Sequence, residues 1–122
     1  MTAASGELFR LVAAGRNVER LQWLRAVGAD VIALGEDDLG ARVAAAHAEQ
    51  SFDAVLDYLW GEPAEKVLTA LGTSQLVAKF HATRFVQIGA MAGPTMNVPA
   101  GVLRSAGITL SGMGMGSVRL RC

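Results

Sequence analysis

The chain has 122 residues, of which 52% are hydrophobic and 18% are charged, and this composition excludes a disordered tail and indicates one compact domain. Its 11 basic and 11 acidic residues give a net charge of zero, so the overall charge favours neither nucleic acid nor an anionic membrane as a partner. No apolar run reaches the ~20 residues that span a bilayer, and the N-terminus lacks the pattern of a secretory signal. We therefore expect a cytoplasmic protein.

Short apolar runs alternate with amphipathic stretches along the chain. The apolar runs predict five strands, at residues 10–14, 31–34, 52–58, 84–88 and 108–111. Start and stop signals predict four helices between them: from Asn17 to Gly28, from Asp37 or Asp38 to Glu49, from Pro63 to Gly72, and from Ala100 to Ser105. Residues 73–83 fit either a short helix or an irregular turn, and residues 91–99 a loop. Such alternation predicts an α/β fold with a parallel sheet and flanking helices on both faces.

Neither the cysteine nor the histidines point to a reactive or metal site. Cys122, the single cysteine, has no partner within the chain, which excludes an internal disulfide, and we interpret it as incidental. His47 and His81 lack the spacing of metal ligands, so no metal site is predicted. We expect both histidines, and Tyr58, to be structural or solvated, and no catalytic residue can be named.

Ligands of open parallel sheets bind beyond the carboxyl ends of the strands. Four turns that follow predicted strands contain glycine: Gly15-Arg16-Asn17, Leu59-Trp60-Gly61, Gly89-Ala90-Met91 and Gly112-Met113-Gly114. Glycine lets the backbone approach a flat ring or a phosphate closely. At any single turn a glycine more often marks a strand that simply ends, so the four turns together, rather than any one of them, indicate a ligand site.

Arg16 is the most informative residue of these turns. In dinucleotide-binding folds an acidic residue after the second strand binds the adenosine ribose, whereas an arginine there accommodates the 2′-phosphate of NADP. If residues 10–14 correspond to that second strand, no acidic residue follows it, and Arg16 stands in the turn instead. The alternative is a solvated arginine at a strand end. Arg20, one helical turn later, either adds to a phosphate site or faces water.

Residues 12–17, 24–30, 52–57 and 84–93, taken in this order and spacing, resemble the medium-chain dehydrogenase/reductase superfamily. The resemblance covers residues 8–117 and is closest to the zinc-free quinone oxidoreductase and alcohol dehydrogenase-like branches. It implies a Rossmann-type NADP(H)-binding domain of an oxidoreductase that transfers hydride to a quinone, enone or carbonyl substrate. The cofactor contacts that it implies are Arg16, Asn17, Leu59, Trp60, Gly61, Ile88, Gly89, Ala90, Gly112 and Met113. For Trp60, packing on the following helix is an equal alternative.

One part of the family pattern is missing from the sequence. No strand, G-x-G-x-x-G turn and helix precede residue 10, although such a turn holds the cofactor pyrophosphate. We therefore expect residues 1–122 to form a single, partial, N-terminally truncated domain without the first strand and without the catalytic domain. Its five-stranded sheet would have a rearranged or incomplete order. Without the first strand, the two strands that normally flank it would each have an unpaired inner edge. These edges would pair directly with each other or with another copy, or the chain would remain partly molten. The isolated chain is expected to be inactive and to bind NADP weakly or not at all.

The sequence leaves a second interpretation open. The chain would then be a non-enzymatic interaction or oligomerisation module, and its last strand, residues 108–111, would pair across a twofold axis to form a homodimer. A methyltransferase-like Rossmann domain is disfavoured, because such domains carry a Gly-rich turn after their first strand and no such turn occurs here.

Overall fold

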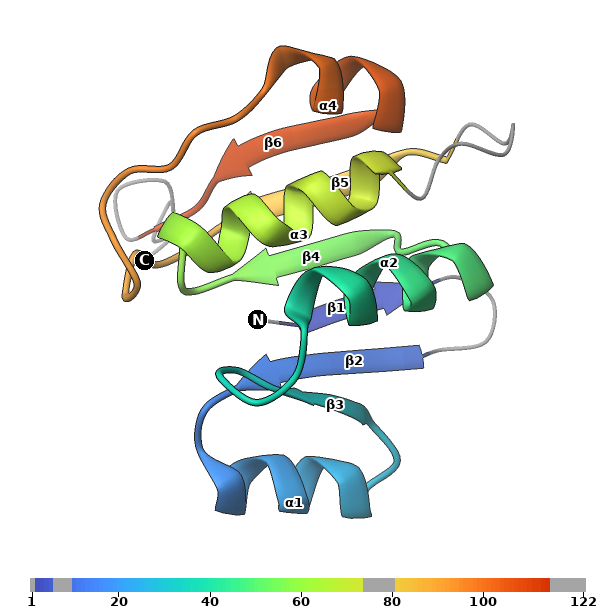
Figure 1. Cartoon of the computed structure of the whole chain (residues 1–122), viewed down its shortest axis with the longest axis vertical. Helices are drawn as coiled ribbons and strands as arrows, with labels where there is room; N and C mark the ends of the chain where they lie inside the picture. Colours follow the sequence, from blue (N-terminus) through green and yellow to red (C-terminus); the bar gives the residue numbers. More distant parts are fainter. Residues whose placement is uncertain (1, 6–9, 74–80, 115–122) are drawn as a thin grey trace, which may run out of the picture.

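The computed structural model describes residues 2–5, 10–73 and 81–114. This part of the chain forms six strands and four helices (Figure 1). In chain order they are β1 (Thr2–Ser5), β2 (Arg10–Gly15), α1 (Val18–Ala26), β3 (Asp30–Ala33), α2 (Leu39–Glu49), β4 (Ala54–Asp57), α3 (Gly61–Thr73), β5 (Thr83–Gln87), α4 (Ala100–Ala106) and β6 (Ile108–Gly112).

The five strands predicted from the sequence are confirmed as β2 to β6, and the four predicted helices as α1 to α4. All six strands form one sheet in the order β3-β2-β1-β4-β5-β6. Strand β2 is parallel to β3, and β4, β5 and β6 are parallel to one another. This is the strand order and helix arrangement of a Rossmann-type α/β fold. Of the ambiguous segment 73–83, residues 74–80 lie outside the described residues, as does the end of the chain from residue 115.

Strand β1 was missed in the sequence analysis. It lies between β2 and β4 and runs antiparallel to both, so that Ala3 is opposite Val12 on one side and Val55 on the other. In Figure 1 its arrow points the opposite way to those of β2 and β4. The inner edges of β2 and β4 therefore neither pair directly nor stay open, because the N-terminal segment supplies their hydrogen-bonding partners. Four small residues carry almost no hydrophobic pattern, which explains why the sequence did not reveal this strand.

The predicted helix starts depend on side chains that satisfy free backbone amides. Asn17 Oδ1 accepts a hydrogen bond from the Arg20 amide at 3.0 Å, and Asp38 Oδ1 accepts one from the Ala41 amide at 3.1 Å. These are N-caps of α1 and α2. Between the two predicted candidates, Asp38 is thus the cap of α2.

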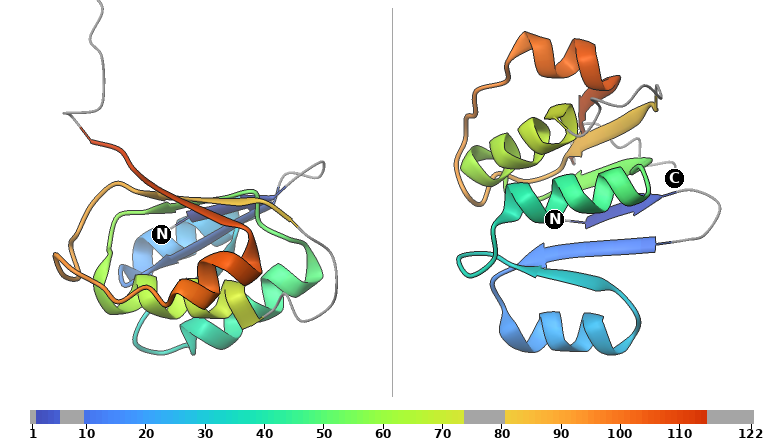
Figure 2. Two further views of the ribbon diagram at one scale, coloured as in Figure 1. Left: turned by 90° about the horizontal axis from the view of Figure 1, so that it is seen from above. Right: turned by 45° about the vertical axis from the view of Figure 1, so that its right-hand side comes forward.

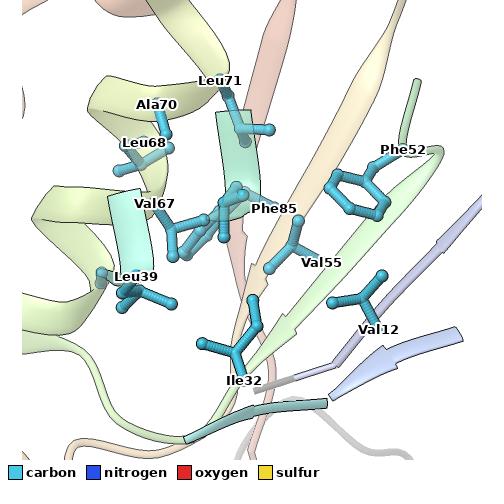
Figure 3. Packing of buried hydrophobic residues seen from close by; sticks show 12 residues of the cluster. Val12, Ile32, Leu39, Phe52, Val55, Val67, Leu68, Ala70, Leu71 and Phe85 are labelled. Atoms are coloured by element: carbon cyan, nitrogen blue, oxygen red, sulfur yellow. The ribbon is translucent and has the colours of Figure 1, made fainter. Parts of the chain in front are cut away.

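The main core lies between the sheet and helices α2 and α3. Figure 3 shows side chains of these helices facing apolar side chains of the strands, with Val67 of α3 beside Phe85 of β5. The most deeply buried members of the cluster are at most 1% exposed: Ile32, Phe52, Val55, Ala64, Val67, Leu68, Leu71 and Phe85. Burial of apolar surface of this extent is the principal stabilising term of the fold.

Helix α1 covers the opposite face of the sheet. It contacts β2 and β3, and its one buried residue, Leu21, does not belong to the main cluster. Ala13 and Val31, which alternate with core-facing residues along β2 and β3, are also buried outside that cluster. Helices α2, α3 and α4 form a layer on the other side, as Figure 2 (left) shows. Among the described helices, none has the length and apolar character needed to cross a membrane.

A histidine is buried at the amino-terminal end of β4. His47 of α2 is 2% exposed, and its Nδ1 accepts a hydrogen bond from the Phe52 amide at 2.9 Å. The rings of His47 and Phe52 stack with their centroids 5.5 Å apart. The Arg10 guanidinium lies over the Phe52 ring, 5.8 Å from its centroid. Burial lowers the pKa of His47 below its usual 6.5, and the nearby His81 lowers it further.

This histidine should make the stability of the protein pH-dependent. Because the pKa of His47 is lower in the folded than in the unfolded state, the unfolded state binds more protons as pH falls through about 6.5. We expect neutral His47 to make its full contribution to the free energy of unfolding above that pH. This contribution should be lost as pH falls toward the folded-state pKa. Urea denaturation between pH 7.5 and 5 measures it. His47→Gln should flatten the curve, whereas His81→Gln should keep most of its slope; equal slopes in all three proteins would refute this.

Candidate functional site

The predicted turns meet at one edge of the sheet. The parallel strands β2 to β6 all end there, while the reversed strand β1 begins there, with Thr2 opposite Ala13 and Leu56. The turns after β2, β4, β5 and β6 therefore share the side of the sheet at which ligands of parallel α/β folds bind. The turn after β3 joins them.

The larger hollow at this edge is a cleft of about 870 Å³, within the range of small-molecule sites. We call it the main cleft. It lies between the ends of β2 and β3, the starts of α2 and α3, and the loop after β5. Its lining residues are Arg16, Leu34, Gly35, Asp37, Asp38, Leu39, Leu59, Glu62, Pro63, Lys66, Met91 and Ala92.

Arg16 reaches across the end of β3 toward the main cleft. Its Nη1 lies 3.7 Å from the position that a Cβ at Gly35 would occupy, so the missing side chain of Gly35 leaves the guanidinium room. Arg16 is exposed, and it forms no ion pair with any residue of the described ranges. Its guanidinium forms no hydrogen bond within the same ranges either, so its five N–H donors are available to an anion in the cleft.

The other charged residues of the main cleft already have partners. Asp37 pairs with Arg42 at 3.3 Å and accepts a hydrogen bond from the Ala33 amide at 2.8 Å. Glu62 pairs with Lys66 at 3.1 Å, and Asp38 caps α2. The carboxylates of the cleft lower the electrostatic potential that an anion would meet, so the attraction exerted by Arg16 is local rather than general.

A smaller cleft of about 350 Å³ lies beside the ends of β5 and β6. It is lined by Trp60, Gln87, Pro94, Leu110, Ser111 and Gly112. The Gln87 amide nitrogen donates to the carbonyl of Gly89 at 2.9 Å, which fixes the side chain at the rim. Aromatic and aliphatic walls with a few polar groups suit a planar, partly polar ligand.

The turn between β4 and α3 separates the two clefts. Asp57, which is fully buried, accepts hydrogen bonds through Oδ1 from the amides of Leu59 at 2.9 Å and Trp60 at 3.2 Å. Trp60 and Gly61 have positive φ angles of 57° and 55°. Consecutive residues of this turn thus line different clefts, Leu59 the main one and Trp60 the smaller one.

The turn after β5 packs directly on this turn. A Cβ on Gly61 would lie 2.9 Å from the carbonyl oxygen of Ala92, and one on Gly89 would lie 2.8 Å from that of Tyr58. Only residues without a side chain permit these backbone approaches.

Of the predicted site residues, the structure brings Arg16 and Leu59 into the main cleft, and Trp60 and Gly112 into the smaller one. The other six lie at the same edge but line neither cleft: Asn17, Gly61, Ile88, Gly89, Ala90 and Met113. Asn17 uses its oxygen to cap α1, and the Ile88 amide donates to the Asp57 carbonyl at 2.7 Å. The predicted site residues that line a cleft are therefore divided between two hollows at this edge.

The turn after β3 contributes to the main cleft, which the sequence did not predict. Gly35, Asp37 and Asp38 line the main cleft, although only the cap role of the two aspartates was considered. The signal was present, because a glycine followed the second predicted strand as it followed the others. The role of Asp57 was missed as well, since a strand residue gives no sign of which amides its side chain will bind.

Within the described residues, two features found in other ligand sites are absent: a Gly-rich turn that binds phosphate, and a cluster of metal-binding side chains. No Gly-rich turn and helix follow β1, since β1 runs in the reverse direction and only four residues separate it from β2. The described part of the chain also contains no group of three or more histidine, cysteine, aspartate or glutamate residues placed to hold a metal ion.

Comparisons with known proteins bear on the fold. The sequence matches no protein-family model, and no curated protein matches it significantly. A candidate alcohol dehydrogenase from Sinorhizobium meliloti 1021 superposes with a TM-score of 0.63 and 22% identity, over 84% of this chain and 26% of that protein. A mycobacterial quinone oxidoreductase gives a TM-score of 0.62 and 22% identity, over 87% of this chain and 31% of that protein. The chain thus has the fold of one part of these oxidoreductases and spans less than a third of their length.

The close approach of the two turns gives a testable result. We expect Gly61→Ala to lower the free energy of unfolding by about 2–4 kcal/mol, because it adds a left-handed alanine and a contact with the Ala92 carbonyl. Gly101→Ala is the control, since its nearest neighbour is a flexible arginine nitrogen at 4.0 Å, and it should be neutral or slightly stabilising. Denaturant titration compares them. An unchanged stability for Gly61→Ala would mean that the turns do not touch.

Proposed function

We propose that the chain is a nucleotide-cofactor-binding domain of medium-chain dehydrogenase/reductase type, and that NADP(H) is its ligand. Such a domain would serve hydride transfer to a quinone, enone or carbonyl compound when a substrate-binding domain accompanies it. The single observation that carries the proposal is the Arg16 guanidinium beside Gly35, which has no ion-pair partner among the described residues and follows the second strand of a Rossmann-type sheet. The fold shared with two oxidoreductases supports it.

In this proposal the adenosine half of NADP(H) occupies the main cleft. Arg16 would bind the 2′-phosphate with two parallel hydrogen bonds, and Leu34 and Leu59 would contact the adenine ring. The nicotinamide half would lie toward the ends of β5 and β6, near Gly89, Ala90 and Gly112. When bound, the cofactor supplies the hydride, and this chain binds and orients it.

Binding should be weak. The backbone amides of a Gly-rich turn would normally hold the pyrophosphate, and each such charge-assisted hydrogen bond contributes about 1.5–3 kcal/mol. Strand β1 starts at the edge where that turn would stand, so these hydrogen bonds have no donor there among the described residues. The carboxylates of the main cleft weaken the attraction further.

Titration with NADPH and NADH, followed by NMR, tests the proposal. We expect weak, saturable binding with a preference for NADPH, because only NADPH carries the 2′-phosphate. Arg16→Ala should remove the preference and cost roughly tenfold to a hundredfold in NADPH affinity, whereas NADH binding should hardly change. Arg25→Ala, which removes an exposed arginine from the last turn of α1, should bind like the original chain. Absence of binding, or a preference that survives Arg16→Ala, would contradict the proposal.

A second candidate function is that of an oligomerisation module. Among the described strands, β6 is the outermost of the sheet and pairs on one side with β5, so its other edge presents backbone N–H and C=O groups. A homodimer would pair two such edges across a twofold axis. Sedimentation equilibrium should then show a mass that rises with concentration, and Leu110→Pro should abolish the rise; a monomer at every concentration would exclude it.

A further inference from the structure

The turn from β4 to α3 contains an unusual backbone conformation. In the described part of the chain, Trp60 is the one residue other than glycine whose backbone lies in the left-handed region, with a φ angle of 57°. A side chain with a Cβ is strained there, and tryptophan has no short polar group to relieve the strain locally. Something outside the turn must therefore hold Trp60 in this conformation.

The buried carboxylate of Asp57 meets that requirement. Both of its oxygens lie 3.2 Å from the Trp60 amide, and Oδ1 also accepts the Leu59 amide at 2.9 Å. A charged acceptor forms stronger hydrogen bonds with amides than a neutral one, and these bonds compensate the burial of the carboxylate. The side chain thus favours the one turn conformation in which both amides point back toward the end of β4.

The backbone of the same segment also holds the next loop. The carbonyl of Asp57 accepts the amides of Ile88 at 2.7 Å and Gly89 at 3.2 Å. The carbonyls of Tyr58 and Leu59 accept the amides of Met91 at 3.3 Å and Ala92 at 2.8 Å. Because Met91 and Ala92 line the main cleft, a change in the turn would move this wall as well.

We propose that Asp57 is a positioning residue for both clefts. It does not line either one. Its carboxylate fixes the turn so that Leu59 faces the main cleft, Trp60 faces the smaller cleft, and Met91 and Ala92 dock against the turn. The consequence for cofactor binding rests on the proposed function, whereas the consequence for the turn does not. A ligand that spans both clefts depends on this one buried side chain.

The test uses Trp60 as its own reporter. The chain has two tryptophans, so Trp23→Phe, a change on the exposed face of α1, leaves Trp60 as the single tryptophan, whose emission is excited apart from that of Tyr58. In that background Asp57→Asn keeps the size of the side chain but turns one acceptor into a donor that faces the Trp60 amide. Asp53→Asn is the matched control. Asp53 directly precedes β4, which ends at Asp57, and its partly exposed carboxylate pairs with His81.

We expect Asp57→Asn to shift the Trp60 emission to longer wavelength and to increase its quenching by acrylamide, while far-ultraviolet circular dichroism shows a folded chain. Hydrogen exchange of the Leu59 and Trp60 amides should accelerate about tenfold or more, and that of the core residue Phe85 should not. Asp53→Asn should change none of these. Unchanged emission and exchange in folded Asp57→Asn would overturn the proposal.

Two further measurements separate a failure to fold, or an absence of NADPH binding, from the role of Asp57. If Asp57→Asn does not fold, hydrogen exchange in the original chain is measured instead. Protection of the Leu59 and Trp60 amides well above that of the amide of the exposed residue Thr95 supports the proposal. Equal exchange rates for the three amides overturn it. NADPH titration of the folded variant should show weaker binding than Asp53→Asn. If the original chain binds no NADPH, the proposed function fails, but the emission and exchange measurements still decide the role of Asp57.

Discussion

The pairing of β1 with both β2 and β4 is the interaction on which the rest of the structure depends. Parallel strands in this order leave two inner edges at the centre of the sheet, and their buried N–H and C=O groups need partners. Ala3 and its neighbours supply them from both sides at once. With this strand in place, α2 and α3 pack on one continuous sheet, and the core from Val12 to Phe85 is a single cluster.

The direction of β1 also determines what the edge at which the parallel strands end contains. A parallel first strand would end at that edge and lead into a turn and a helix, whereas β1 starts there and leads away from it. The turns after β2, β3, β4 and β5 keep their places, so the main cleft with Arg16 forms without a turn at the centre of the sheet. The same pairing thus completes the sheet and limits the candidate site to the outer parts of this edge.

Much of this architecture was predictable because the signals are local. Apolar runs bounded by glycine predicted β2 to β6, and Asn17 and Asp38 marked helix starts through hydrogen bonds to amides three residues away. Strand β1 was not predictable, since four small residues bear no periodicity and their place depends on partners far along the chain. The contacts of Asp57 depend in the same way on a turn conformation that residue order alone does not specify.

The orientation of β1 is most directly measured by nuclear Overhauser effects between backbone protons in solution. The account predicts contacts that run in opposite directions along the two strands, with Thr2 close to Ala13 and Leu56, and Ala4 close to Leu11 and Ala54. Contacts that ascend together along both strands, or direct contacts between β2 and β4 without residues 2–5 between them, would contradict it.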